Sequence, residues 1–345
     1  MPNTTEVFMN ILVVSGGRSA ERDVSLVSGA WVREALTGAG HSVTDVRIGP
    51  GGDWTLSGGH LSIDAGECPW KLFSGGAELI FDVLFPVLHG PFGEDGTVQG
   101  LCETAGWPCA GVPVMGCAVA MDKQTMRLLA RDAGLPLLPW VFTDGSEEPG
   151  LFAGQALQLG STLFVKPSRM GSSVGISRAE GRDELIAAIE TASRYDSRIL
   201  VEQALTAPRE IEVSVLGTGG RVEASVPGEI VPGREWYDYR AKYHCDDSRL
   251  MIPADLSEAT ARSIRQMAMT AFRLLGGTGF ARVDFLADRT TGEVFFNEVN
   301  TIPGFTSISM FPKLWDASGL SCEKLLNAIL SEALARPLTG TAAKP

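Results

Sequence analysis

The amino-acid sequence predicts an α/β fold, α+β in part, that begins with an open parallel sheet. Two apolar runs of strand length, residues 9–14 and 79–88, lead into turns containing Gly16 and Gly90. Short continuous apolar runs are typical of strands that are buried on both faces, as in parallel sheets. A helix predicted over residues 25–36 and closed by Gly38 and Gly40 follows the first run. We therefore expect functional loops at the carboxyl ends of these strands.

The remaining elements alternate in a different order. A helix is predicted over residues 121–134, ended by Gly134 and Pro136, and a second helix near 183–192. Strands are expected at 162–166, 199–202 and 210–216, then a helix near 257–275 and a hairpin formed by 281–286 and 293–300. We expect an N-terminal domain over residues 1–120, a small central domain over 121–205, a C-terminal domain over 206–338, and a disordered tail over 339–345.

Composition limits the classes of function. The 345 residues allow two or three domains at roughly 100–200 residues each. A formal net charge of -12 argues against non-specific binding to nucleic acid or to an anionic membrane. Six scattered cysteines without a CxxC pair fit neither a disulfide framework nor a zinc site. No run reaches the ~18–20 apolar residues of a membrane span, and the first residues lack a basic leader, so we expect a cytoplasmic protein.

The predicted C-terminal hairpin carries a group of oxygen ligands. Glu298 and Asn300 lie two residues apart, so they share one face of their strand, and the turn brings Asp284 back alongside them. Such an incomplete set suits magnesium when phosphates and waters supply its other ligands. The alternative is a solvated hairpin with ordinary surface acids. The apolar residues on either side favour the metal site, because a buried carboxylate requires a cation or several donors.

Two further segments could bind a nucleotide. Lys166 ends a strand and precedes a loop of small residues, 167–175, whose backbone N–H groups could surround anionic oxygens. Neither a Walker motif nor a dinucleotide fingerprint is present, so spacing alone leaves a plain flexible loop as the alternative. Glu202 ends the next strand and could accept from an adenine amino group, although many strand ends look similar.

Taken in order along the chain, the motifs resemble the D-alanine–D-alanine ligase family of the ATP-grasp superfamily. The resemblance covers about residues 10 to 330. The segments that carry it are Ser19–Leu26 (SAERDVSL), His89–Gly96 (HGPFGEDG), Met121-Asp122-Lys123, Lys166–Gly175, Tyr237-Asp238-Tyr239, Ala241-Lys242-Tyr243 and Asn297–Ser309 (NEVNTIPGFTSIS). The resemblance implies an ATP-grasp fold, with ATP as a substrate and two Mg²⁺ or Mn²⁺ ions as cofactors. D-alanine would be the other substrate, and the family expectation is a homodimer.

The same resemblance implies a role for each matching residue. ATP would be bound by Lys123, Lys166, the loop containing Gly171 and Ser173, and the group Glu202, Ala204, Leu205 and Glu210. The metal ligands would be Asp284, Glu298 and Asn300. Glu21 and His89 would bind the first D-alanine, Ser309 would bind the second, and Lys242 would contribute to substrate binding. Arg282 and the Gly304 N–H would stabilise the oxyanion, and Ser172 and Tyr243 would hydrogen-bond towards Glu21.

The implied reaction is ATP-dependent joining of two D-alanines through an acyl phosphate, for peptidoglycan precursor synthesis. A D-alanine–D-lactate ligase is the nearest alternative, and Tyr243 favours an amine as the second substrate. Another ATP-grasp carboxylate–amine ligase is more distant, because Glu21, His89, Tyr243 and Ser309 all match. A non-catalytic nucleotide-binding protein is disfavoured, because every matched phosphate and metal position holds a competent residue.

Overall fold

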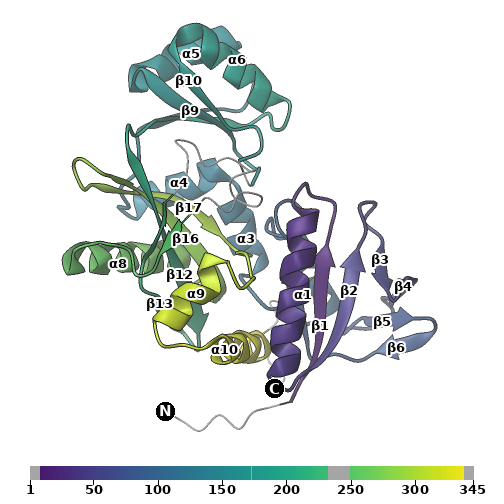
Figure 1. The fold of residues 1–345 in the computed structure, drawn as a ribbon. Coiled ribbons are helices and arrows are strands. Elements are labelled where there is room, and N and C mark those ends of the chain that lie inside the picture. Colours follow the sequence, from purple (N-terminus) through teal and green to yellow (C-terminus); the bar gives the residue numbers. More distant parts are fainter. Residues whose placement is uncertain (1–7, 172, 232–248, 338–345) are drawn as a thin grey trace, which may run out of the picture.

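The computed structural model describes residues 8–171, 173–231 and 249–337, which are arranged around three sheets (Figure 1). The N-terminal sheet has seven strands in the order β6-β5-β4-β3-β2-β1-β7. Its elements are β1 (Asn10–Gly16), α1 (Arg22–Gly38), β2 (Ser42–Ile48), β3 (Trp54–Leu56), β4 (Gly59–Asp64), β5 (Lys71–Ser74), β6 (Ala77–Leu79), β7 (Val83–Val87) and α2 (Thr97–Ala105).

This sheet is mixed, so the expectation of an open parallel sheet was only partly correct. Strands β2, β1 and β7 are parallel, whereas β3 to β6 pair antiparallel. The links β3–β4 and β5–β6 are two-residue turns with positive φ, at Ser57-Gly58 and Gly75-Gly76. Such turns form hairpins, while a parallel connection needs a dozen or more residues. The predicted strand 79–88 is correspondingly divided, since β6 ends at Leu79 and β7 begins at Val83.

The second sheet is small and antiparallel, in the order β10-β9-β11-β8. It comprises β8 (Trp140–Thr143), β9 (Thr162–Pro167), β10 (Ser177–Glu180) and β11 (Ile199–Gln203), with α5 (Pro149–Ala156), the short helix η1 (Leu157–Leu159) and α6 (Gly181–Ser193). Val165 and Val201 pack with the apolar side chains of α5 and α6. Because neighbouring positions alternate between faces, Lys166 and Glu202 project from the opposite face, away from these helices.

The third sheet has six strands, with β15-β14-β12-β16-β17 in order and β13 paired to β12. Its strands are β12 (Pro208–Thr218), β13 (Arg221–Ala224), β14 (Gly228–Val231), β15 (Arg249–Met251), β16 (Gly279–Asp288) and β17 (Val294–Asn300). The helices of this region are α3 (Val114–Met121), α4 (Lys123–Asp132), α8 (Glu258–Leu274), α9 (Met310–Ala317) and α10 (Cys322–Ala335). Apolar residues of α3, α4 and α8 share one core with this sheet.

Helix α4 begins two residues later than predicted. Asp122 is its N-cap, and the Asp122 carboxylate accepts a hydrogen bond of 2.9 Å from the Thr125 N–H. Residues 114–121 form the separate helix α3. The cap therefore places Lys123 in the first turn of α4.

A β-bulge on β17 separates the core residues from the polar residues of the hairpin. Asp284 pairs with Glu298, but Phe285 pairs with Phe296, so Asn297 is an extra residue. Without it, Phe296 and Glu298 would point to the same face. The bulge lets Phe296 enter the core, where its ring centroid lies 6.2 Å from that of Phe285. Glu298 then faces the other side of the sheet.

The first and third sheets are joined by a shared hydrophobic core. Val13 and Phe85 of the N-terminal sheet belong to the same buried cluster as Phe280, Phe305 and Phe311. The ring centroids of Phe305 and Phe311 lie 5.0 Å apart, and those of Phe85 and Phe305 lie 6.0 Å apart. This cluster holds the carboxyl end of β7 against the loop that follows β17.

Candidate active site

Polar side chains form two rows across three neighbouring strands, β12, β16 and β17. One row contains Glu212, Asp284 and Glu298 in register, and the other places Arg282 opposite Asn300. The alternate residues Val283 and Phe285 lie in the core. Alternation along the strands therefore gathers the three predicted metal ligands and Arg282 on one face.

Arg282 and Asn300 both donate hydrogen bonds to the carboxylate of Asp284. Arg282 donates from Nε to Asp284 Oδ1 and from a terminal nitrogen to Oδ2, both at 2.7 Å. Asn300 Nδ2 donates to the same Oδ2 at 2.9 Å, and Arg282 Nε lies 3.1 Å from Glu212 Oε2. The single positive charge of Arg282 offsets part of the charge of these two carboxylates.

Lys123 connects the start of α4 to the acidic rows. Its Nζ lies 3.5 Å from Glu298 Oε2 and donates to the Met170 carbonyl at 2.8 Å. The Lys123 N–H donates to the Ser168 carbonyl at 3.0 Å, and the Gln124 N–H to the Ser168 hydroxyl at 3.3 Å. Ser168 is fully buried, so it fixes the root of the predicted phosphate loop against the first turn of α4.

Lys166 and Glu202, predicted to bind opposite ends of ATP, are ion-paired with each other. Glu202 also pairs with Arg127 of α4, and both partners of that second pair are buried. Burial alone would raise the pKa of Glu202, but the positive charges of Arg127 and Lys166 outweigh it and lower the pKa. Glu202 is therefore an ionised acceptor at neutral pH.

The other residues predicted at the adenine edge lie after β11. The Ala204 N–H already donates to the Thr162 carbonyl at 3.1 Å, and Leu205 follows it. Glu210 lies on β12, opposite Ile230 of β14 and Leu286 of β16. Glu210 lies two residues before Glu212 on the same face of β12, so it borders the acidic rows.

Glu21 lies at the junction of two loops. It is the N-cap position of α1 and is buried. A Cβ atom at Gly90 would lie 2.4 Å from Glu21 Oε2, and one at Gly171 would lie 3.1 Å from it. Both glycines thus allow their loops to approach the Glu21 carboxylate closely.

His89 is buried, and both of its ring nitrogens have partners in the protein. Nδ1 lies 2.9 Å from the Ile302 carbonyl, and Nε2 lies 3.1 Å from the Ser28 hydroxyl. Burial lowers the pKa of His89 to about 4, the hydrogen bond to Ile302 acts in the opposite direction, and Arg282 lowers it further. A carbonyl can only accept, so the neutral ring carries its proton on Nδ1 and accepts from Ser28 at Nε2.

Gly304 and Ser309, predicted for the oxyanion and the second substrate, are neighbours. A Cβ atom at Gly304 would lie 2.9 Å from Ser309 Oγ. Ser309 Oγ accepts from the Thr306 N–H at 3.0 Å and lies 2.7 Å from the Thr306 hydroxyl. Thr306 therefore orients Ser309 toward the loop that contains Gly304.

A small cavity of about 30 Å³ lies where these elements meet. Four of the predicted residues, Lys123, Gly171, Glu298 and Asn300, line it. The other lining residues are Glu94, Ala120, Met121, Met170, Val299 and Thr301. This volume is well below the ~300–1,000 Å³ of pockets for drug-sized ligands.

Three predicted residues, Ser172, Lys242 and Tyr243, lie outside the described residues, as do the predicted tail and the aromatic residues Trp236, Tyr237 and Tyr239. Ser173, next to the first of them, has a positive φ of 61° in the predicted phosphate loop.

Sequence reasoning missed three residues of this region as individual site members: Glu94, Arg127 and Glu212. Glu94 lies in the glycine-rich motif after His89, where an acidic side chain commonly accepts hydrogen bonds only from its own turn. Arg127 lies one helical turn after Lys123, a spacing that places both on the same side of α4. Glu212 lies two residues after Glu210, and the strand period could have placed it on the acidic face.

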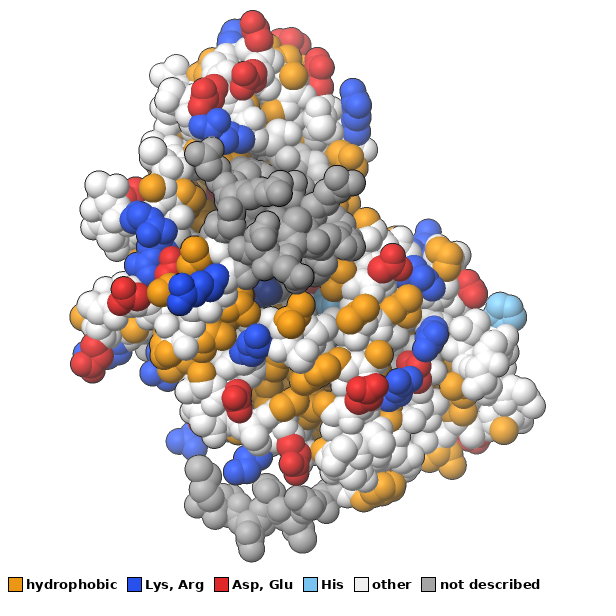
Figure 2. Space-filling model, viewed as in Figure 1, with side chains coloured by type: hydrophobic (Ala, Val, Ile, Leu, Met, Phe, Trp, Pro, Cys, Tyr) orange, Lys and Arg blue, Asp and Glu red, His pale blue; other side chains and the backbone are white. Residues whose placement is uncertain are grey.

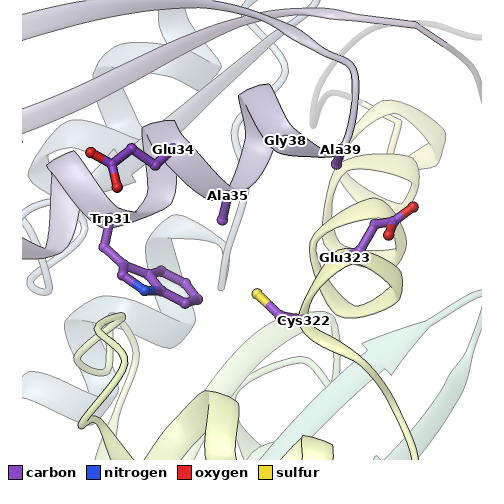
Figure 3. Close-up of a pocket in the computed structure, with 7 residues that line it drawn as sticks. All are labelled: Trp31, Glu34, Ala35, Gly38, Ala39, Cys322 and Glu323. Carbon is purple, nitrogen blue, oxygen red and sulfur yellow. The ribbon is translucent and has the colours of Figure 1, made fainter.

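A larger hollow, about 370 Å³, lies between α1 and α10 (Figure 3). Its lining combines apolar side chains with two carboxylates and consists of Trp31, Glu34, Ala35, Gly38, Ala39, Cys322 and Glu323. Burial and the neighbouring acids Asp316 and Glu323 raise the pKa of Cys322 to about 11, so its thiol is protonated at neutral pH. The lining contains none of the predicted site residues.

Comparison with known proteins identifies the family. The family model for the D-ala D-ala ligase N-terminus matches residues 10–112, and that for the D-ala D-ala ligase C-terminus matches residues 129–331. A D-alanine–D-alanine ligase of Heliobacterium modesticaldum is 44% identical over 94% of each chain, and one of Bradyrhizobium sp. is 42% identical over 97% of this chain and 96% of the relative.

The chain belongs to the D-alanine–D-alanine ligase family.

Solved structures of the family agree with this assignment. D-alanyl-alanine synthetase A of Vibrio cholerae superposes with a TM-score of 0.87 at 31% identity, covering 95% of this chain and 99% of that one. The VanG D-Ala:D-Ser ligase of Enterococcus faecalis superposes with a TM-score of 0.84 at 31% identity, covering 95% of this chain and 100% of that one. The predicted ATP-grasp fold and the assignment as an ATP-dependent ligase of this family are confirmed.

The surface and the helices bear on the predicted partners. On the face shown in Figure 2, basic and acidic side chains are interspersed rather than gathered by sign. Among the described residues, no helix is both long enough and apolar enough to cross a membrane.

Proposed function

We propose that this chain joins two D-alanine molecules to D-alanyl-D-alanine, for peptidoglycan precursor synthesis, with ATP converted to ADP and phosphate. One observation carries the proposal beyond family membership. Lys123 Nζ, predicted to contact phosphate, lies 3.5 Å from Glu298 Oε2, predicted to hold metal. The phosphate-binding and metal-binding groups therefore meet at one point.

The donor set at that point suits magnesium or manganese. Asp284, Glu298 and Asn300 offer carboxylate and amide oxygens on one face, which are the hard ligands these ions prefer. Among the described residues, no three His, Cys, Asp or Glu side chains form a metal-binding group. Three protein ligands leave coordination positions for phosphates and waters, as magnesium sites commonly do. Bound there, two such ions would neutralise charge on the transferring phosphoryl group.

The protein's own residues bind and orient the reactants. The buried carboxylate of Glu21 suits the ammonium group of the first D-alanine, and the neutral His89 beside it fixes the loop that Gly90 begins. Lys123 and Lys166 would draw the γ-phosphoryl group toward the first carboxylate, giving an acyl phosphate. For this, Lys166 leaves Glu202, which Arg127 continues to neutralise.

Attack by the amine of the second D-alanine then creates an oxyanion. The Arg282 guanidinium and the Gly304 N–H would stabilise it, and Ser309, beside Gly304, would bind the second carboxylate. Movement of the loop at Gly171 over Glu21 would exclude water, which would otherwise hydrolyse the acyl phosphate.

We further propose a cytoplasmic homodimer with the domain division 1–120, 121–205 and 206–338.

The second substrate is the point at which relatives differ. The VanG ligase, a D-Ala:D-Ser ligase by its name, shares the fold at a TM-score of 0.84, so the fold alone leaves the second substrate open. A D-alanine–D-lactate ligase is the other candidate, and Tyr243 speaks against it.

The test is phosphate release by the purified chain with ATP and magnesium. D-alanine alone should support turnover and give the dipeptide, identified by mass spectrometry. When D-lactate or D-serine is added to D-alanine, the mixed product should not exceed the D-alanyl-D-alanine formed. L-alanine should support neither phosphate release nor product formation. Turnover that requires D-lactate or D-serine would refute the proposal.

A further inference from the structure

Glu94 contacts both sides of the junction between the first and third sheets. Its Oε2 accepts from the Gly90 N–H at 2.7 Å, and its Oε1 accepts from the Ile302 N–H at 3.3 Å. The Glu94 carbonyl also accepts from the Thr301 hydroxyl at 3.3 Å. One side chain thus links the loop after β7 to the loop after β17.

The same Ile302 peptide segment is held from its other side by His89. His89 Nδ1–H donates to the Ile302 carbonyl at 2.9 Å, while Glu94 accepts from the Ile302 N–H. Ile302 is 3% exposed, so both backbone groups are buried and need these partners. We call this arrangement, made by His89 and Glu94 on Ile302, the Ile302 clasp.

We propose that Glu94 is a positioning residue: through the Ile302 clasp it fixes the loop that carries Gly304 against the pocket around Glu21. Gly304 follows Ile302 by two residues, and Gly90, the other partner of Glu94, lies directly against the Glu21 carboxylate. The clasp therefore sets the distance between the first-substrate pocket and the oxyanion donor. This inference rests on the proposed function for the roles of Glu21 and Gly304.

The chemistry of the contacts explains why this residue is glutamate. Two N–H groups on different loops each need an acceptor, and a carboxylate offers two oxygens on one group. Glutamine would offer one acceptor oxygen, and aspartate is shorter by one methylene.

The test compares Glu94→Gln and Glu94→Asp with wild type. Asp95→Asn is the matched control, because Asp95 accepts from the Phe92 and Thr97 N–H groups of its own loop. Hydrogen–deuterium exchange of the peptide over residues 300–306 should be roughly tenfold faster in both Glu94 variants, as expected for the loss of a buried hydrogen bond. Exchange in the control should match wild type.

Kinetics then separate positioning from a general structural role. In both Glu94 variants, kcat for dipeptide formation should fall about ten- to a hundredfold, while the Kd for ATP stays within about twofold of wild type. Unchanged exchange over 300–306, unchanged kcat, or a loss of ATP binding that equals the loss of kcat would each overturn the proposal. If wild type formed no dipeptide, the proposed function would fail. The exchange experiment would still show whether Glu94 holds the loop through the Ile302 clasp.

Discussion

Arg282 and Asp284 form a two-pronged ion pair, with both nitrogen–oxygen distances at 2.7 Å. The first residue is the proposed oxyanion donor, and the second is a proposed metal ligand. A cation that binds Asp284 would compete with Arg282 for the same two oxygens, so we expect metal binding and the freeing of Arg282 to be coupled. Metal binding would thereby make the guanidinium available where the oxyanion develops.

Replacing Arg282 should therefore affect metal binding and catalysis in opposite directions. In Arg282→Met, Asp284 has lost its competing cation, so a lower concentration of magnesium should give half-maximal phosphate release. The same change removes an oxyanion donor, which should lower kcat about 10²–10³-fold. A magnesium titration of the initial rate measures both values. Weaker apparent metal affinity in the variant would contradict the coupling.

Glu298→Gln should abolish most turnover without unfolding the chain. The change keeps the shape of the side chain but removes a proposed metal ligand, so we expect a loss of at least about 100-fold in kcat. Glu293→Gln is the control, because Glu293 is exposed beside the turn of the same hairpin. Phosphate release and circular dichroism of both variants provide the comparison. Near-wild-type activity in Glu298→Gln would exclude the metal role.

Gly90→Ala should raise the KM for D-alanine selectively. Gly90 has a φ of +74°, and an added Cβ would lie 2.4 Å from Glu21 Oε2. Gly76→Ala is a control for backbone strain alone, since Gly76 has a φ of +85° and nothing within 4 Å of the added atom. Both variants should lose about 1 kcal/mol in free energy of unfolding, and only Gly90→Ala should show the higher KM. Equal KM values in the two variants would argue against contact with Glu21.

Arg127→Met should destabilise the fold strongly. It leaves the buried carboxylate of Glu202 with Lys166 as its remaining cation, and breaking a buried pair costs about 3–5 kcal/mol. Arg131→Met, one turn later and exposed on the same helix, should change little. Urea unfolding gives both values. The double variant with Glu202→Gln should lose less than the sum of the single losses, and strict additivity would rule out the pairing.

His89 should contribute a pH dependence to stability. Its pKa is about 4 in the fold, below its usual 6.5, so its neutral form is favoured by folding. The stability linked to His89 is present above pH 6.5 and is lost as the pH falls toward 4. In His89→Gln, the free energy of unfolding should fall less over this range than in wild type. His60→Gln, at an exposed residue of β4, should keep the wild-type slope, and a wild-type slope in His89→Gln would disprove the link.

Much of this fold could be predicted from the pattern of apolar residues. Runs with a period of two or 3.6 gave the helices α1, α6 and α8 and the hairpin β16–β17 within a few residues. The antiparallel half of the N-terminal sheet was missed because its short strands β4 and β6 are mostly exposed and lack a continuous apolar run. Their signal was in the turns, where Gly58 and Gly76 allow two-residue hairpins.

The site was predictable where one strand carried it, and not where distant segments meet. Glu298 and Asn300 share a strand face, so their grouping follows from local geometry. The pairs Lys166–Glu202 and Glu94–Ile302 depend on packing between segments, and local spacing carries no information about them. Burial of Arg127 was also hidden, because an arginine on a helix normally faces solvent.

The bulge at Asn297 has a consequence for how this family can diverge. Substitutions at individual positions of β17 leave the two faces of the strand where they are. A gain or loss of one residue between Phe296 and Glu298 would exchange the faces, turning the Glu298 carboxylate into the core and a phenyl ring toward the acidic rows. Evolution can therefore change the chemistry of this strand one side chain at a time, whereas its length is fixed from the bulge to Asn300.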